Sequence, residues 1–496
     1  DGVEAPRWMF WKRQRFVVVI MVFLGFFNVY SLRVNLSVAI VAMTETRNST
    51  LENGTVISEK LFDWDSKQQG LILSSFFYGY ICTMFAGGFL ATKFGANYIF
   101  ATGIGVTALL TLATPVAASS SLYLLLAIRI IEGVFEGVTF PCVHAIWSKW
   151  APPNERSRMV TIGYAGNYAG TVIAYPISGI LATTYGWESV FYVFGSIAVV
   201  WLLLFLLLIR ESPEKDWLIS DGEKKYIMTS LKQNDGNNKK LKIPWKSIFS
   251  SPAVWAIVCA QFSENWGFYT LLTQLPTMLN DTIGYNLGKT GLLSALPYLT
   301  MGVLLGISGF IADWLQNKGY LTTTQVRRYF NCVAFIAQTI FMVLAGYMQD
   351  PAAMITSITI GIGLGAFAWT GFAVNHLDIA PQYAGLLMGI TNTFGTIPGI
   401  VSPIITGHIV QNRLRSEWRN VLFIAAGIYL FGCIVYWFWA SGEVQDWAKE
   451  NKSDDDDINN KDQVILKDNG LNISKTFNAN NPKNQVDTGV DNYGYN

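Results

Sequence analysis

Long apolar stretches recur along almost the whole chain, separated by short polar segments. Many of them reach the roughly 20 residues that a helix needs to cross a hydrocarbon layer of ~30 Å. A search with windows of about 19 residues predicts twelve spans, approximately at 16–44, 68–91, 97–118, 121–147, 159–184, 188–209, 252–279, 289–312, 327–348, 352–374, 384–410 and 419–440. The pattern therefore predicts an all-α membrane protein with twelve transmembrane helices.

Polar segments divide these spans into two pseudo-symmetric six-helix halves. Gly88–Lys93 ends the second span, and the similar Gly309–Trp314 ends the eighth. Repeated halves of this kind predict a binding site between them, near the middle of the membrane. The predicted organisation is an N-terminal segment, an N-terminal half, a polar linker, a C-terminal half and a disordered tail, at 1–15, 16–209, 210–251, 252–441 and 442–496.

Basic residues indicate the orientation of the chain. They cluster before the first span, after the fourth and in the linker. Because cytosolic loops of membrane proteins carry the excess of Lys and Arg, we expect both termini and the linker to be cytosolic. The loop between the first two spans then lies on the far side. Its sequons predict glycosylation at Asn48 and Asn53.

The composition supports this class and adds exclusions. Hydrophobic residues make up 51% of the chain and charged residues only 14%, with a net charge of +1. A soluble domain has about a quarter charged residues. The five cysteines lie inside apolar runs without metal-ligand spacing. We therefore expect no enzyme, no metal, no cofactor other than a coupling ion (H⁺ or Na⁺) and no nucleic-acid partner, but a monomer in a lipid bilayer.

Charged residues inside the predicted spans are the candidate functional groups, since each is costly there without a partner or water. Arg33 lies deep in the first span, and the fourth contains Arg129, Glu132, Glu136 and His144. At about 100° per residue, the four residues of the fourth span fall on one stripe, within roughly 60° of Arg129. We expect that stripe to face the interior of the protein.

The chemistry of this set suits transport of an anion together with a cation. The guanidinium groups of Arg33 and Arg129 match the geometry of a carboxylate or phosphate. Glu136, assisted by Glu132 and by His144, is the predicted coupling group. A carboxylate that alternates between binding a proton and pairing with an arginine links the binding of the proton to the binding of the substrate. The alternative is a structural network of ion pairs that locks the fourth span to its neighbours.

Weaker candidates lie in other spans. Tyr80, Tyr164 and Tyr269 are phenols that either hydrogen-bond the substrate or simply pack. Asn392 either contacts the substrate or joins helices. Glu264 is either a second coupling group or the partner of a nearby basic residue.

At these residues the chain resembles the anion:cation symporter family of the major facilitator superfamily, which includes sialin, the vesicular glutamate transporters and the sodium-phosphate cotransporters. The resemblance is carried by 26–39, 75–80, 129–141, 144–157, 375–381, 389–394 and 442–447. It implies a twelve-helix fold with alternating access, anion binding by Arg33 and Arg129, and a role of Glu136 in substrate binding and proton coupling. Glu132 matches a further glutamate that sialin carries.

The chain also departs from that family. Vesicular glutamate transporters have a histidine in place of Leu73 and an arginine in place of Glu264, so the resemblance argues against a dicarboxylate substrate. Sialic acid, another organic anion and inorganic phosphate remain open, as do proton and sodium coupling. A plasma-membrane sodium-phosphate cotransporter and a passive anion channel are the alternatives. The membrane in which the protein resides is also left open: it is either the plasma membrane or a lysosomal or endosomal membrane.

Overall fold

The computed structural model describes residues 13–50, 56–84, 86–232, 243–284 and 286–449. All of them except Lys449 belong to one compact unit, Asp1–Ala448. Most of the predicted N-terminal segment, part of the linker and the tail after residue 449 lie outside the described residues.

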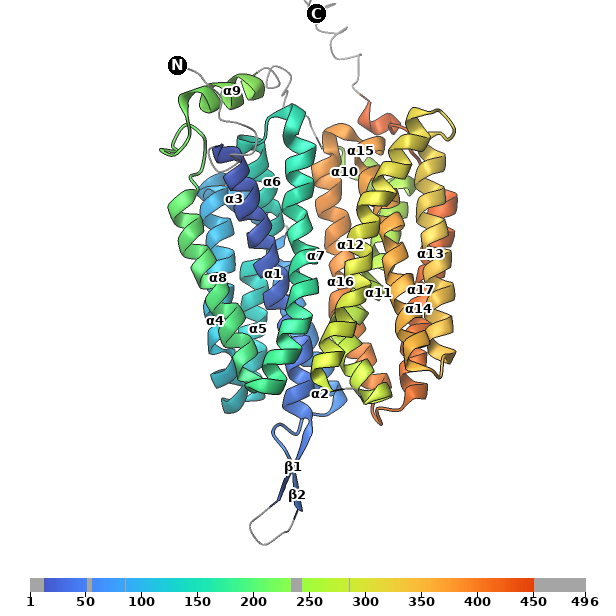
Figure 1. Ribbon diagram of the computed structural model, residues 1–496. Coiled ribbons are helices and arrows are strands. Elements are labelled where there is room, and N and C mark those ends of the chain that lie inside the picture. The colour runs from blue at the N-terminus through green and yellow to red at the C-terminus, as the bar shows by residue number, and fades with distance from the viewer. Residues whose placement is uncertain (1–12, 51–55, 85, 233–242, 285, 450–496) are drawn as a thin grey trace, which may run out of the picture. The chain divides into compact units, whose positions relative to one another are not determined.

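The N-terminal half consists of helices that follow the predicted spans within a few residues, except where a span is broken (Figure 1). Two spans are each formed by two helices, with α5 ending at Glu136 and α6 beginning at Thr139. The helices of this half are α1 (Gln14–Thr44), α2 (Ser66–Met84), α3 (Gly87–Phe94), α4 (Ala96–Ser120), α5 (Leu122–Glu136), α6 (Thr139–Trp150), α7 (Pro153–Thr184) and α8 (Glu188–Leu208).

The C-terminal half has well-defined helix ends. Proline occupies the first turn of α11 and of α14, where its missing N–H costs nothing. Gly284 ends α11 with a φ of 69°, a conformation that favours glycine. The elements of this half are α11 (Pro252–Ile283), α12 (Leu287–Asn317), α13 (Thr323–Tyr347), α14 (Pro351–Ala368), η3 (Trp369–Ala373), α15 (Val374–Ile379), η4 (Pro381–Tyr383), α16 (Ala384–Ile409), α17 (Arg415–Trp439) and η5 (Asp446–Ala448).

Within the described residues, eight segments are long and apolar enough to cross a membrane as uninterrupted helical stretches. The four other predicted spans coincide with α2–α3, α5–α6, α7 and α11. These are the spans that are interrupted or that carry many polar side chains. The sequence prediction of twelve spans and the helices of the structure therefore agree in position.

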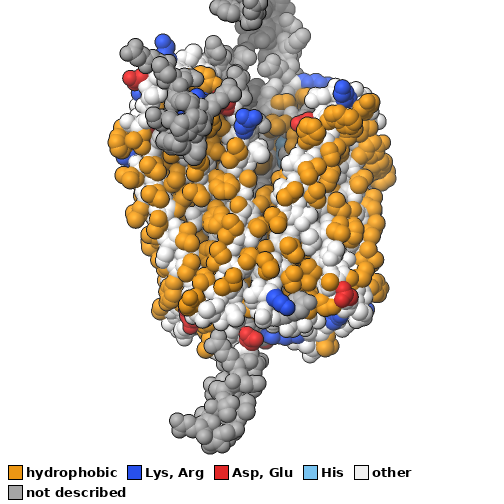
Figure 2. Space-filling view, in the orientation of Figure 1, with side chains coloured by type: hydrophobic (Ala, Val, Ile, Leu, Met, Phe, Trp, Pro, Cys, Tyr) orange, Lys and Arg blue, Asp and Glu red, His pale blue; other side chains and the backbone are white. Residues whose placement is uncertain are grey.

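The surface has the polarity that a bilayer requires. Figure 2 shows hydrophobic side chains over the sides of the molecule and most charged side chains near its two ends. Large apolar side chains are exposed on helices of both halves, among them Leu203, Phe310, Val333 and Phe438. An apolar exposed surface of this extent marks contact with lipid.

A two-stranded hairpin was not expected from the sequence. β1 (Thr46–Thr50) pairs antiparallel with β2 (Val56–Lys60), and the hairpin projects from the end opposite to α9 and to the start of α1 (Figure 1). Its strands are short and mostly polar, so they lack the apolar alternation that identifies a strand in a sequence. Asn48 lies in β1, and Asn53 lies outside the described residues. Glycosylation of both stays a prediction.

The described part of the linker contains two helices, α9 (Asp221–Lys232) and α10 (Trp245–Ser250). Arg15 of α1 forms ion pairs of 3.0 Å with Glu155 of α7 and with Glu223 of α9. Lys149 pairs with Glu211 at 2.7 Å and holds the pKa of that carboxyl below its usual range. These contacts attach the linker to the N-terminal half at the end of the molecule where α1 begins.

The two halves meet most closely at the hairpin end. Gly70 of α2 lies against the Pro403 carbonyl of α16, and Gly407 of α16 lies against the Ser66 carbonyl. Gly179 of α7 makes the same kind of approach to the Leu287 carbonyl of α12. Backbones come this close only when small residues line the contact. We call these contacts the glycine seam, and they close the hairpin end.

The other end of the interface is more open. An added Cβ would have no neighbour within 4 Å, among the described residues, at Gly306 and Gly309 of α12 or at Gly385 and Gly389 of α16. His144 of α6 is exposed there. The structure is therefore closed at the hairpin end and more accessible from the end that carries the linker.

The glycine seam leads to a first prediction. Gly70→Ala places a Cβ on the Pro403 carbonyl, and overpacking of this kind costs about 1–3 kcal/mol. We expect it to open the hairpin end, so that a thiol introduced by Ser37→Cys, at a position 2% exposed, reacts faster with an impermeant maleimide added from that side. Gly427→Ala, at a site with no neighbour of an added Cβ among the described residues, is the control. Equal labelling of the two variants would contradict the role of the seam.

Candidate functional site

Arg33 and Glu136 form a buried ion pair in the N-terminal half. The guanidinium of Arg33 donates through Nε (3.0 Å) and through Nη2 to the same oxygen, Oε1 of Glu136. The side chains are 3% and 1% exposed. Arg33 Nη1 and Glu136 Oε2 have no hydrogen-bond partner among the residues that the structure describes. The pair therefore retains one donor and one acceptor for a further ligand.

Aromatic rings surround the Arg33 guanidinium. Its Cζ atom lies 4.8 Å from the ring centre of Tyr30, 4.9 Å from that of Phe76 and 4.9 Å from that of Tyr80. Such contacts stabilise a cation and orient the plane of the guanidinium. The predicted site residue Tyr80 thus lies at the pair, with its ring against Arg33.

A second ion pair lies beside the first. Arg129 Nη1 donates to Glu132 Oε2 at 2.6 Å, and the Thr111 hydroxyl donates to Glu132 Oε1 at 3.0 Å. Phe76 links the two pairs, because Arg129 Cζ lies 5.4 Å from its ring centre. Arg129 also interacts electrostatically with Glu136. Two arginines and two glutamates therefore form one buried cluster, which is neutral when both carboxyls are ionised.

The Arg129–Glu132 pair gives a prediction that separates structure from transport. Removing one partner of a buried pair costs about 3–5 kcal/mol, because the other charge is left uncompensated. We expect Arg129→Gln to lower the thermal stability of the purified protein, and Arg129→Gln with Glu132→Gln to recover most of it. If Arg129 also binds the anion, the double variant regains stability without regaining uptake. Recovery of both would leave Arg129 with a structural role only.

Tyr269 approaches the cluster from the C-terminal half. Its ring lies 4.8 Å from that of Phe77 of α2, edge to face, and its phenol is close enough to Arg33 to interact electrostatically. The site therefore has contributions from both halves, as the repeat pattern predicts for the middle of such a protein.

Three other predicted residues do not join the cluster. The Tyr164 hydroxyl and His144 Nε2 are 3.0 Å apart, and Tyr164 stacks on Phe140. The stripe that we extrapolated from Arg129 to His144 assumes an unbroken helix, whereas α5 ends at Glu136 and α6 begins at Thr139, and His144 lies about two helical turns beyond Glu136. His144 therefore pairs with Tyr164, and no described contact joins it to Glu136.

Asn392 connects helices. Its Oδ1 accepts from Gln261 Nε2 of α11 at 2.9 Å, and its Nδ2 donates to Met84 Sδ of α2 at 3.6 Å. Thr396 also donates to Met84 Sδ, at 3.7 Å. Asn392 therefore lies at a contact between the two halves, and among its described contacts none is with Arg33 or Glu136.

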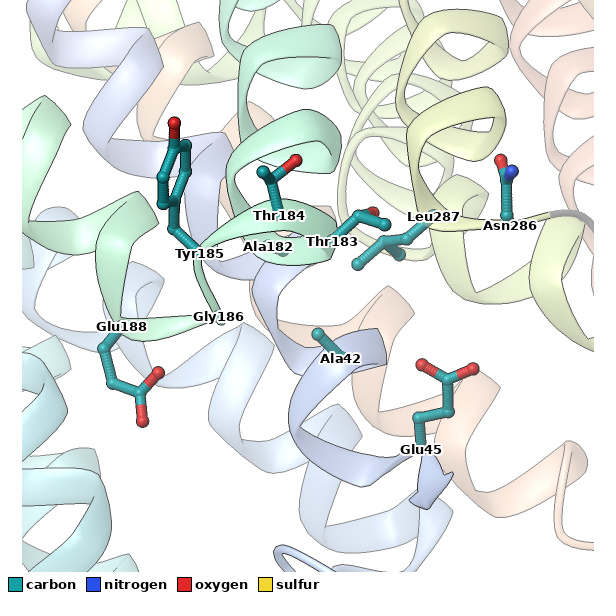
Figure 3. A pocket seen from close by; sticks show the side chains of 10 residues that line it. All are labelled: Ala42, Glu45, Ala182, Thr183, Thr184, Tyr185, Gly186, Glu188, Asn286 and Leu287. Atoms are coloured by element: carbon teal, nitrogen blue, oxygen red, sulfur yellow. The ribbon is translucent and has the colours of Figure 1, made fainter. Parts of the chain in front are cut away.

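A separate pocket of about 620 Å³ opens near the hairpin end. Figure 3 shows Glu45 at the end of α1, Glu188 at the start of α8 and Tyr185 around it. Its described lining contains two carboxylates and no basic residue. Because this lining is acidic whereas the buried cluster contains two arginines, we interpret the pocket as a vestibule outside the closed end and separate from the cluster.

Tyr30 and Phe76, two of the aromatic residues at the Arg33 guanidinium, were not predicted from the sequence. Tyr30 precedes Arg33 by three positions and Phe76 precedes Tyr80 by four, so each shares a helix face with a predicted residue. A spacing of three or four residues within a helix could therefore have identified both residues as neighbours of predicted site residues. The approach of Phe76 to both arginines is a tertiary contact, which the spacing does not reveal.

The helical halves and the buried charge cluster define a membrane transporter, and the comparisons with known proteins identify its family. The model of the Major Facilitator Superfamily matches residues 18–403, so the chain belongs to that superfamily. Human sialin is 45% identical over 451 residues, which cover 88% of this chain and 90% of sialin. Human vesicular glutamate transporter 2 is 43% identical over 448 residues, covering 89% of this chain and 77% of the relative.

These relatives fit the anion:cation symporter group, which confirms the resemblance seen in the sequence. They also confirm that the chain is a transporter and not an enzyme. Solved structures support the fold alone. A bacterial homologue of the human lysosomal transporter Spinster, inward-facing and occupied, has a TM-score of 0.65 at 12% identity and covers 85% of this chain and 96% of its own. A D-xylose–proton symporter has a TM-score of 0.64 at 15% identity, with coverages of 86% and 98%.

Proposed function

We propose that this protein is a secondary active transporter that carries a small anion together with a cation by alternating access. The anion is an organic acid such as sialic acid, or inorganic phosphate. The single observation that carries the proposal is the buried cluster around Arg33 and Glu136, with its unpaired Nη1 and Oε2 atoms. No enzymatic step is part of it.

The charge of the cluster supplies the coupling. With both carboxyls ionised the cluster is neutral, and Glu136 occupies the donors of Arg33. A cation that binds Glu136 gives the cluster a net positive charge and frees the guanidinium for an anion. Anion binding in turn favours the cation, because coupling between two sites is reciprocal. We propose H⁺ as that cation, since the described hydrogen-bond partner of the carboxylate is the Arg33 guanidinium rather than a shell of oxygens.

The alternating step uses the interface between the halves. The glycine seam closes the hairpin end while the linker end is more accessible, so the described state is the one that exchanges substrate at the linker end. We propose that this end faces the cytosol, with both termini on the same side. The protein then acts as a monomer, because one chain contains the whole site.

Uptake into proteoliposomes tests the function. The purified protein is supplied with labelled sialic acid or labelled phosphate, under a proton gradient and separately under a sodium gradient. Concentrative uptake of either anion that depends on the proton gradient supports the proposal. Sodium-driven phosphate uptake would replace it with a sodium-phosphate cotransporter. Flux that follows voltage alone, without counterflow, would replace it with a passive anion channel.

A further inference from the structure

Glu264 of α11 is a buried carboxyl without a cation. Glu264 is 1% exposed. Oε1 accepts a hydrogen bond from Gln338 Nε2 of α13 at 3.3 Å, while Oε2 has no partner among the described residues. No basic side chain within the described part of the chain acts on its charge. The expected basic partner is therefore not found, and the alternative of a coupling group remains.

The neighbouring helices are shaped around this carboxyl. Gly365 of α14 lies against Oε1 so closely that a Cβ there would collide with it. The Tyr429 hydroxyl of α17 lies against Gly267, one turn after Glu264 on α11. The carboxyl group is fully buried, and the glycine leaves the space that it occupies. We therefore interpret the surroundings of Glu264 as a specific site for this side chain.

The groups that face Glu264 determine which cation it takes. The titratable ones are phenols, Tyr429 from α17 and Tyr168 from α7, and α13 and α14 present Gln338 and Gly365. A sodium ion requires a shell of several oxygens, yet one oxygen of Glu264 is already occupied by an amide N–H. A lone carboxylate in such surroundings is far more costly than a carboxylic acid. A proton on Oε2 removes that cost.

Glu264 is also connected to the opposite half. Tyr168 interacts electrostatically both with Glu264 and with Tyr30, and Tyr30 lies on the Arg33 guanidinium. Tyr168 belongs to the N-terminal half, so it moves relative to α11 whenever the halves rock. The surroundings of Glu264 therefore change with the transport cycle.

We propose that Glu264 is a second proton-binding site of the transport cycle, located in the C-terminal half. In the state described by the structure Oε2 carries the proton. When the halves move and Tyr168 withdraws, Oε2 becomes accessible to water and exchanges the proton with the aqueous phase on that side. The coupling role rests on the proposed function, but the protonation does not.

Infrared spectroscopy tests the protonation without any substrate. The purified protein in lipid nanodiscs is compared at neutral pH with Glu264→Gln and with the control Glu188→Gln, a glutamate at the hairpin-end pocket. We expect a carbonyl-stretch component of a protonated carboxyl that Glu264→Gln lacks and Glu188→Gln retains. Glutamine imitates the neutral acid, so the variant should fold. Identical spectra of the unmodified protein and Glu264→Gln would overturn the proposal.

The coupling is tested by the equilibrium accumulation of labelled sialic acid or phosphate in proteoliposomes at several proton gradients. The logarithm of the anion accumulation ratio is plotted against the logarithm of the proton concentration ratio across the membrane. We expect the slope of this plot to be about one unit lower in Glu264→Gln than in the unmodified protein. An unchanged slope would refute the coupling role. Absence of proton-driven accumulation in the unmodified protein would refute the proposed function together with that role, while the infrared result would still decide the protonation.

Discussion

Glu136→Gln is expected to lower gradient-driven accumulation by about one power of the proton ratio, the share that depends on the Arg33 cluster, while exchange of the anion across the membrane continues. Glutamine keeps the shape of the side chain and an oxygen that can accept from Arg33, but it neither binds nor releases a proton. The cluster around Arg33 then keeps one net positive charge at every pH. An anion still binds and crosses, yet the cluster no longer couples its movement to the proton gradient, and the proton-driven accumulation that remains comes through Glu264.

The measurement is uptake of the labelled anion into proteoliposomes, with and without a proton gradient, alongside counterflow with the same anion inside. Glu188→Gln makes the same chemical change outside the cluster, and we expect it to accumulate anion as the unmodified protein does. An accumulation ratio of Glu136→Gln that rises with the proton gradient as steeply as that of the unmodified protein would show that another group performs this part of the coupling.

Arg33→Lys is expected to raise the KM for the anion by about 10- to 100-fold. Lysine keeps the charge but loses the planar fork that donates twice to Glu136 and lies among three rings. Loss of a hydrogen bond to a charged group costs about 1.5–3 kcal/mol, and each 1.4 kcal/mol corresponds to a factor of about ten. Initial rates of anion uptake over a range of concentrations measure the effect.

Arg419→Lys is the matched control for this substitution. Arg419 of α17 also lies over aromatic rings, with its Cζ 5.7 Å from the ring centre of Tyr347 and 6.0 Å from that of Phe423, but it is not part of the cluster. We expect its KM to stay within twofold of that of the unmodified protein. A KM of Arg33→Lys that is equally unchanged would remove Arg33 from the binding site.

The positions of the helices and of the buried charged residues could be predicted from the sequence, for physical reasons. A membrane span must satisfy all its backbone hydrogen bonds internally, so apolar length alone locates it. A buried ionisable residue must have a partner or a task, so Arg33, Arg129, Glu132 and Glu136 could be selected without a structure. Their assembly into one cluster agrees with that selection.

Other features depended on tertiary contacts that a single sequence does not contain. The break between α5 and α6 at 137–138 is different, because Pro141 lacks the N–H that would bond the Gly137 carbonyl, and this signal in the sequence was overlooked. The role of Asn392 at a contact between halves depends on Met84, which is 308 positions away in the chain. The hairpin of β1 and β2 was missed because its two five-residue strands are mostly polar in sequence and show no regular alternation of apolar and polar residues.

The two proposed proton sites differ in one respect that determines how the membrane voltage acts. The Arg33 cluster is neutral when empty, and it is neutral again when a proton and a monovalent anion are bound. Glu264 has no counter-charge among the described residues, so it is neutral with its proton and negative without it. In the proposed cycle the loaded carrier therefore crosses without net charge, whereas the empty carrier moves one negative charge. A potential of 100 mV acts on that return step with about 2.3 kcal/mol, so voltage sets the rate at which the empty carrier resets rather than the rate at which it delivers its cargo.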